Sequence, residues 1–394
     1  MVTVVQAKGE ELERAFSTLG FLNSEAALHV EAGRTEWFFC RGLTEPLPRR
    51  LHAALIGEGI VRYEAADGTA ILLGGCRSAW RALLARFPDE PGWTEIGERI
   101  AKSLGLPWSL RAVTRLAGED WHWGERTYVM GILNVTPDSF SDGGKYLDLG
   151  AAVAHAEKML AEGADFIDVG GESTRPGADP VPESEELRRV VPVVEAIVKR
   201  LSARVSVDTY KSAVAKAAVE AGAAVINDVT GLRGDPRMAE VAAELGVPII
   251  LQHIQGSPKN MQQDPRYVSV VPEVLQGLKD SADRALAAGV RPENIIVDPG
   301  FGFGKRLEHN LTLLARLAEL RTLGYPVLSG TSRKSMVGAV LGLPVSERVE
   351  GTAATVALSV AGRADIVRVH DVGIMVRTVK VADATFRDQL VVRR

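Results

Sequence analysis

A short unit recurs along the second part of the chain: a helical stretch, a glycine, an apolar run and a polar residue. The glycine suits the end of a helix, because glycine readily adopts the positive φ needed there. These glycines are Gly163, Gly222, Gly246, Gly289, Gly324 and Gly362. An apolar run between helices predicts a strand buried on both faces, which is typical of a parallel sheet with crossover helices.

The number of strands decides the architecture. We expect a strand, followed by a helix, near residues 127–134, 165–169, 204–208, 224–228, 248–253, 294–298, 326–330 and 365–370. Eight strand–helix units predict an α/β fold of the (β/α)8 barrel (TIM barrel) type. A doubly wound open sheet is the alternative architecture.

The first part of the chain reads differently. A hairpin is expected over residues 60–73, because Asp67-Gly68 is a favoured turn between two apolar runs. Helical patterns are found near residues 9–19, 46–58 and 77–87. These signals predict a small α+β N-terminal domain before the barrel.

Three segments follow from this division. Residues 1–105 form the α+β module, and residues 127–394 form the barrel. Between them, residues 106–126 contain Pro107 and the Trp121-His122-Trp123 cluster. We interpret this segment as a linker packed on the base or rim of the barrel.

Charge and cysteine content exclude several classes of protein. The chain has 46 Lys+Arg and 50 Asp+Glu, and this net charge of −4 argues against a nucleic-acid partner or an electrostatic membrane anchor. Only Cys40 and Cys76 occur, so no disulfide framework or zinc ribbon is expected. We find no apolar run of about 18 residues and no secretion signal. We therefore expect a cytoplasmic protein.

Polar side chains end nearly every expected strand. Because the carboxyl ends of barrel strands face the active site, these side chains should form a ring at one mouth. They are Asn134, Asp168, Asp208, Asn227, Gln252, His253, Asp298, Ser329, Arg368 and His370. A single residue of this kind is often a satisfied core group, but so many buried polar groups each need a partner.

The residue types in this ring suggest a ligand. Asp208, Asn227 and Asp298 suit a flat heterocycle that presents several N–H donors and ring acceptors. Lys334, Arg368 and His370 supply positive charge where such barrels often hold phosphate. We expect a pocket for a heterocycle with a phosphorylated tail.

Three glycine-rich segments follow expected strands. Residues 135–144 and 170–178 are interpreted as mobile lids, with Phe140 available to cover a ring. The segment 300–305 (GFGFGK) is not a P-loop, because its glycine spacing is wrong and Arg306 stands where Ser or Thr is required.

Seven segments together resemble the dihydropteroate synthase family. They are residues 130–144, 168–177, 207–209, 226–228, 298–305, 332–335 and 368–371. The resemblance covers about 127–394 and leaves the N-terminal module outside. It implies condensation of 6-hydroxymethyl-7,8-dihydropterin diphosphate with 4-aminobenzoate, giving 7,8-dihydropteroate and pyrophosphate. It also implies a homodimer, since barrels of this family commonly pair through their late helices.

The resemblance assigns roles to individual residues. The pterin ring would be held by Asp208, Asn227, Asp298 and Lys334, and the diphosphate by Arg368, His370, Asn134 and Thr174. Mg²⁺ would bind Asn134 and Asp138, because a hard cation prefers oxygen ligands. Candidates for the aminobenzoate wall are Phe140, Pro176, Phe303 and Ser335. The residues expected to act in catalysis are Asp208, Asp298, Lys334 and Arg175.

The chemistry implied is an SN1-like substitution. Pyrophosphate leaves a methylene attached to an electron-rich ring, and the neutral aniline nitrogen attacks, so no covalent nucleophile is needed. One segment departs from the family pattern: Gln252-His253-Ile254-Gln255 replaces the usual Met-His-Met. Ile254 lacks the adaptable thioether of methionine, which puts the placement of the pterin ring in question.

Two other functions remain as alternatives. A related pterin barrel transfers a methyl group from methyltetrahydrofolate to a corrinoid protein, but Arg368, His370 and Lys334 have no diphosphate to hold in that chemistry. A catalytically silent paralogue could act as a pterin sensor or scaffold through its N-terminal module. Loss of diphosphate or lid residues would support this reading, and none is lost.

Overall fold

A computed structural model describes residues 3–7, 35–41, 60–64, 70–76, 113–136, 149–173 and 177–387, with single positions between 80 and 101. The chain divides into two compact units. One comprises residues 1–111 with 318–324, and the other comprises residues 112–317 with 325–394. The division after residue 111 lies inside the segment that the sequence analysis interprets as a linker.

The N-terminal unit contains a four-stranded antiparallel sheet in the order β1-β2-β4-β3. Its strands are β1 (Thr3–Ala7), β2 (Thr35–Arg41), β3 (Ile60–Glu64) and β4 (Ala70–Cys76). The pairing of β3 with β4 confirms the expected hairpin, whose turn lies outside the described residues. Phe38 and Trp80 pack edge to face, with ring centroids 5.0 Å apart. The expected helices 9–19 and 46–58 lie outside the described residues, whereas Trp80, Leu83 and Leu84 are helical within the third.

The second unit is a closed barrel of eight parallel strands. They are β7 (Tyr128–Asn134), β8 (Phe166–Gly170), β9 (Val205–Asp208), β10 (Val225–Asp228), β11 (Ile249–Gln252), β12 (Ile295–Asp298), β13 (Leu328–Ser329) and β14 (Ile366–Val369). The strand order β12-β11-β10-β9-β8-β7-β14-β13 is closed by a parallel bridge between Val297 and Val327. The (β/α)8 prediction is confirmed, and the open-sheet alternative is wrong.

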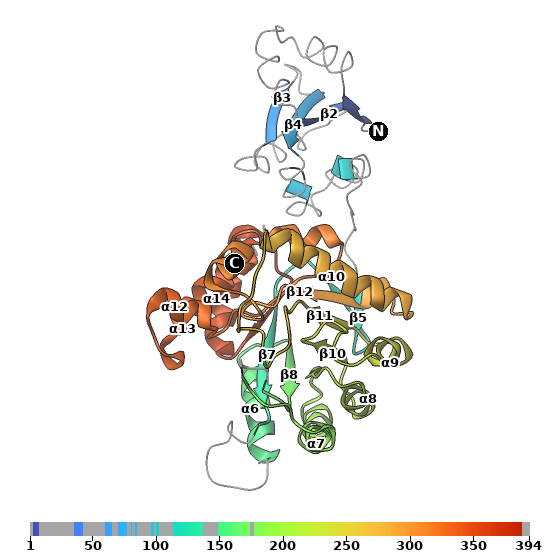
Figure 1. Cartoon of the computed structure of the whole chain (residues 1–394), viewed down its shortest axis with the longest axis vertical. Helices are drawn as coiled ribbons and strands as arrows, with labels where there is room; N and C mark the ends of the chain where they lie inside the picture. Colours follow the sequence, from blue (N-terminus) through green and yellow to red (C-terminus); the bar gives the residue numbers. More distant parts are fainter. Residues whose placement is uncertain are drawn as a thin grey trace, which may run out of the picture. The chain divides into compact units, whose positions relative to one another are not determined.

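Helices surround this barrel (Figure 1). They are α6 (Leu149–Ala161), α7 (Glu183–Leu201), α8 (Ser212–Glu220), α9 (Met238–Leu245), α10 (Val270–Ala287), α11 (Leu307–Ala315), α12 (Ser335–Leu341), α13 (Val349–Ala361) and α14 (Val372–Phe386), with short 3-10 turns η2 (Pro292–Asn294), η3 (Leu317–Leu323) and η4 (Val345–Glu347). Gly246 ends α9 with φ 67°, as the sequence predicts. Gly362, at the end of α13, does not adopt the predicted positive φ. Its φ is −76°, and the next residue, Arg363, has the positive φ of 63°. No described helix is long and apolar enough to cross a membrane.

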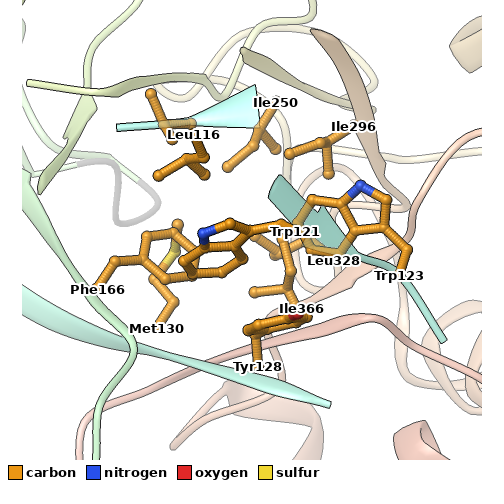
Figure 2. Packing of buried hydrophobic residues seen from close by; sticks show 11 residues of the cluster. Leu116, Trp121, Trp123, Tyr128, Met130, Phe166, Ile250, Ile296, Leu328 and Ile366 are labelled. Carbon is orange, nitrogen blue, oxygen red and sulfur yellow. The ribbon is translucent and has the colours of Figure 1, made fainter. Parts of the chain in front are cut away.

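An aromatic hairpin fills the barrel at the amino ends of its strands. Strands β5 (Val113–Leu116) and β6 (Glu119–His122) pair within the segment 106–126, so the second half of that segment is part of the barrel unit. Trp121 stacks on Tyr128 with centroids 4.2 Å apart and meets Phe166 edge to face at 5.4 Å (Figure 2). Trp123 Nε1 donates to Thr114 Oγ1 at 2.8 Å, which satisfies its buried N–H.

Two layers of side chains fill the barrel interior, because every second residue of a strand faces the same side. The lower layer is apolar and packs against the hairpin; its strand members are Met130, Phe166, Val225, Ile250, Ile296, Leu328 and Ile366. Two residues farther along most of these strands, the side chains are polar: Asp168, Asn227, Gln252, Asp298 and Arg368. The upper layer is therefore the floor of a polar site.

Ser329 was predicted to belong to this polar ring, and that prediction is wrong. Because Leu328 faces the interior, the next residue faces outward. Ser329 Oγ lies 2.8 Å from Ser359 Oγ on helix α13. The serine therefore ties strand β13 to the surrounding helices.

We expect Trp121→Ala to destabilise the barrel by about 3–5 kcal/mol, because it removes a large buried aromatic side chain from a packed layer. Denaturant unfolding of the full-length variant measures this loss. Trp121→Phe retains an aromatic ring and serves as the matched control, with a smaller loss. A destabilisation below about 1 kcal/mol for Trp121→Ala would show that the hairpin does not support the barrel.

Candidate functional site

Arg368 links two buried carboxylates across the polar layer. Its Nε donates to Asp168 Oδ2 and its Nη2 donates to Asp208 Oδ2, each at 2.7 Å. Asp168 is completely buried, whereas the Arg368 side chain keeps 20% of its surface exposed. Buried charges need such partners, because an unpaired charge in a protein interior is strongly destabilising. The ion pairs therefore hold three side chains, from β14, β8 and β9, together.

Asn227 extends this network but leaves acceptors unused. Its Nδ2 donates to Asp168 Oδ2 at 3.1 Å. Among the described residues, Asp168 Oδ1 and Asn227 Oδ1 are buried without a hydrogen-bond partner. A buried acceptor without a donor is costly, so the two oxygens point to a ligand or water that supplies N–H or O–H groups.

Burial changes the protonation of the carboxylates. It raises the pKa of Asp208 to about 7, an effect that Arg368 opposes and that neighbouring Asp168 reinforces. Burial also raises the pKa of Asp298, although the Gly300 N–H, which donates to Asp298 Oδ1 at 2.7 Å, acts in the other direction. Asp208, on the floor of the site, can thus change charge near neutral pH.

Lys334 lies directly before helix α12 and faces the β12–α11 loop. Its Nζ donates to the Phe301 carbonyl and lies 4.3 Å from the centroid of the Phe303 ring. Burial lowers the pKa of Lys334 to about 8, and Asp298 partly offsets this effect. Two predicted site residues, Lys334 and Phe303, are thus brought together, with the exposed Ser335 next in the chain.

His370 is oriented by the preceding strand–loop unit. The His370 backbone N–H donates to Ser332 Oγ at 3.2 Å, and this hydroxyl lies 3.0 Å from His370 Nδ1. The adjacent residues form a second tie, since Arg333 Nε donates to Asp371 Oδ2 at 2.9 Å. Together they hold the loop that carries Lys334 against the loop that carries His370.

Several predicted residues cannot be placed. Asp138, Phe140, Thr174, Arg175 and Pro176 lie outside the described residues. Asn134 ends strand β7 and is partly buried. The described residues contain no group of three or more His, Cys, Asp or Glu side chains suited to a metal ion. The roles expected for these residues, and for Mg²⁺, stay predictions.

Gln252 and Ile254, in the segment that departs from the family pattern, are both buried. Gln252 Nε2 donates to the Val229 carbonyl at 3.3 Å. Ile254 is 1% exposed and belongs to a cluster with Val229, Met261 and Phe303. Ile254 therefore supports the residue predicted for the aminobenzoate wall.

Asp168 is central to this geometry, although the only role predicted for it was membership of the polar ring. Its place in the strand was the available signal, because it stands two residues after the inward-facing Phe166. Lys305, whose side chain is 3% exposed, was also passed over. It ends segment 298–305, which resembles the family and is not a P-loop, but no role was predicted for this lysine.

Comparison with known proteins identifies the family. The model of a family described as pterin binding enzymes matches residues 130–370. The chain belongs to the pterin-binding enzyme family. It is 53% identical over 260 residues to the dihydropteroate synthase of Bacillus subtilis, covering 66% of this chain and 89% of the relative.

Solved structures of this family give the same result. The Yersinia pestis dihydropteroate synthase in a sulfonamide drug complex has a TM-score of 0.65 and 48% identity, over 68% of this chain and 98% of that one. The Xanthomonas albilineans dihydropteroate synthase with 4-aminobenzoic acid has a TM-score of 0.66 and 45% identity, over 70% and 98%. The pterin-binding barrel is therefore matched almost completely.

The raised pKa of Asp208 predicts how the stability of this pterin-binding barrel depends on pH. The folded state binds a proton at Asp208 up to about pH 7, whereas the unfolded chain releases it near pH 4. The free energy of unfolding should therefore fall as pH rises through this window, by roughly 2 kcal/mol between pH 5 and pH 8. Urea unfolding at both pH values, with Asp208→Asn as the control, isolates this contribution. An equal change with pH in the two proteins would contradict the assignment.

Proposed function

We propose that this protein is a dihydropteroate synthase, which transfers a dihydropterin-methyl group from 6-hydroxymethyl-7,8-dihydropterin diphosphate to 4-aminobenzoate. The products are 7,8-dihydropteroate, a folate precursor, and pyrophosphate. The observation that carries the proposal is the polar floor of the barrel, where buried acceptors and cations meet. Relatives about 50% identical over the barrel carry this name.

Recognition of the pterin follows from the acceptors. A dihydropterin presents ring N–H and amino donors along one edge, which match the carboxylates of Asp208 and Asp298 and the amide oxygen of Asn227. Among the described residues, this Asn227 oxygen is buried without a hydrogen-bond partner, and Asp168 Oδ1, which also lacks one, is a further acceptor in the same layer. Lys334, 4.3 Å from the Phe303 ring centroid, supplies a donor for a ring nitrogen or oxygen.

The diphosphate is assigned to Arg368, His370, Asn134 and Thr174. Among the described residues, Arg368 uses Nε and Nη2 for its two ion pairs, so Nη1 remains for a phosphate oxygen. The amide oxygen of Asn134 suits a hard cation, and with Asp138 it would hold Mg²⁺ together with the phosphates. When bound, the ion neutralises charge on the departing pyrophosphate.

The reaction needs little more than positioning and charge. Arg368 and His370 stabilise the leaving group, while Asp208 and Asp298 stabilise positive charge that develops on the ring. The neutral aniline nitrogen of 4-aminobenzoate then attacks the methylene. Phe303 and Ser335 are the described candidates for its binding wall, with Phe140, Arg175 and Pro176 proposed from the two loops. Sulfonamide drugs would compete here, as a complex of the Yersinia pestis relative suggests.

Assembly as a homodimer is supported by exposed apolar side chains on the late elements. They lie on and after helix α12 and on α13: Val340, Leu341, Leu343, Val345 and Leu358. A patch of this kind marks an association surface in many proteins. A cytoplasmic location is supported by Cys40, a free buried thiol whose pKa burial raises to about 12.

Pyrophosphate release from the pterin diphosphate with Mg²⁺, measured with and without 4-aminobenzoate, tests the function. We expect release that depends on aminobenzoate and forms dihydropteroate. Saturable pterin binding without release would instead favour a silent pterin sensor. The assay also distinguishes the synthase from a methyltransferase acting on a corrinoid protein, because that reaction involves no diphosphate.

Asp298→Ala should lower kcat/KM by about 10- to 150-fold, because a hydrogen bond to a charged group contributes about 1.5–3 kcal/mol and the ring loses such a partner. Steady-state kinetics and calorimetric titration with the pterin diphosphate measure the loss, which should be seen in pterin affinity as well. Asp383→Asn is the control, because Asp383 accepts hydrogen bonds from Thr127 at the opposite end of the barrel and should not affect kcat/KM. Turnover near that of the wild type would remove Asp298 from the site.

Deletion of residues 1–110 should leave the chemistry of the barrel largely intact, with kcat/KM within about threefold of the full-length value. The expectation rests on the described site, whose side chains all belong to residues 112–394. Circular dichroism establishes that the truncated protein is folded. A folded truncation without activity would show that the N-terminal module takes part in function.

A further inference from the structure

Six consecutive backbone carbonyls, from Gly300 to Lys305, each accept a hydrogen bond from a side chain. Backbone carbonyls usually pair with backbone N–H groups, so a run of this kind is unusual. The donors are Lys305 to Gly300 and Phe303, both at 3.0 Å, Lys334 to Phe301, Gln262 to Gly302 at 2.5 Å, Tyr267 to Gly304 at 2.9 Å and Asn310 to Lys305 at 3.2 Å. Side chains from several elements therefore fix the shape of this loop, which follows strand β12.

Lys305 lies at the centre of the loop. Its side chain is 3% exposed, and its Nζ also lies 3.0 Å from His253 Nδ1 and 3.3 Å from the His253 carbonyl. The Lys305 amino group, whose pKa burial lowers well below its usual value, thus joins the loop to the end of strand β11. Such a group is stable in the interior only with several acceptors, and four surround it here. Burial lowers the pKa of His253, so its neutral ring offers Nδ1 as one of them.

The close approach of two backbone segments requires glycine at two positions of this loop. Gly300 has φ 66°, and a Cβ atom there would lie 2.0 Å from the His253 carbonyl oxygen. Gly304 has φ 59°, and a Cβ atom there would lie 2.4 Å from the Gln255 carbonyl oxygen. Two backbone segments therefore lie in direct contact, and carbonyls from both accept hydrogen bonds from Lys305 Nζ.

The same loop supports the substrate side of the site. The Phe301 carbonyl accepts from Lys334, and the Phe303 ring lies beside the Lys334 ammonium. We propose that Lys305 is a positioning residue that fixes the Phe301 carbonyl and the Phe303 ring, and through them orients Lys334 and the aminobenzoate wall. It does so without touching substrate. The proposal rests on the proposed function.

Lys305→Met in the full-length protein tests this role, because methionine keeps much of the side-chain length and removes the amino group that donates the hydrogen bonds. We expect the KM for 4-aminobenzoate and the Kd for the pterin diphosphate to rise about tenfold, by more than kcat falls. Asp383→Asn is the matched control: it replaces one of the two buried oxygens that accept hydrogen bonds from Thr127, at the other end of the barrel, with an amide NH2 group. This control should lower stability and leave KM unchanged.

A double-mutant cycle supplies a readout that a purely structural role would not give. If Lys305 acts through the Phe303 ring, Lys305→Met should raise the KM for aminobenzoate no further in a Phe303→Leu background. Lys305→Gln, which keeps two N–H donors, should recover part of the affinity and replaces Lys305→Met if that variant does not fold.

Unchanged KM and Kd in a folded Lys305 variant, or full additivity with Phe303→Leu, would overturn the proposal. Absence of aminobenzoate-dependent pyrophosphate release in the wild type would instead reject the proposed function. The two failures are therefore distinguishable.

Discussion

The site depends on one buried arrangement, the Arg368 guanidinium held between Asp168 and Asp208. A lone carboxylate in this layer would be neutral or would destabilise the fold, whereas a shared cation lets two of them stay close together. Asp168 also accepts a hydrogen bond from the Asn227 amide, and Oδ1 of each residue is left without a donor among the described residues. The ion pairs thus determine which acceptors are left for a ligand.

The apolar layer beneath makes this polar floor possible. The hairpin that carries Trp121 closes the amino end of the barrel, so water is excluded from below and the lower strand residues pack against aromatic rings. Exclusion of water strengthens the ion pairs above and raises the pKa of Asp208 and Asp298 through desolvation. The apolar layer and the polar layer lie two residues apart on the same strands, so the packing of the first determines the electrostatics of the second.

Much of this arrangement could be predicted from the sequence, because apolar runs and polar strand ends are local signals. All eight barrel strands were predicted near their observed positions. The prediction for Ser329 was wrong because it rested on the position of the residue at the end of a strand and not on the face to which it points. Its neighbour Leu328 faces the interior, so Ser329 faces outward. The hairpin of residues 113–122 was assigned to a linker, since its short strands bury only alternate residues, and its packing depends on strands far away in the chain.

Tertiary contacts decide the remaining features. Nothing local to the segment 300–305 shows that Gln262, Tyr267 and Asn310 hold its carbonyls, because two of these residues come from the preceding loop. Similarly, Arg368 was expected at the diphosphate, and only the assembled barrel shows its guanidinium between two carboxylates. A cation of this kind can contact a phosphate only through atoms that its structural partners leave available.

A crystal structure of the chain with 6-hydroxymethyl-7,8-dihydropterin diphosphate tests the central claim most directly. The account predicts that the pterin ring lies on the polar floor, with its N–H groups donating to Asn227 Oδ1 and to the carboxylates of Asp208 and Asp298, and with the diphosphate near Arg368 and His370. A ring bound elsewhere, with the oxygens of Asp168 and Asn227 still without donors, would contradict it.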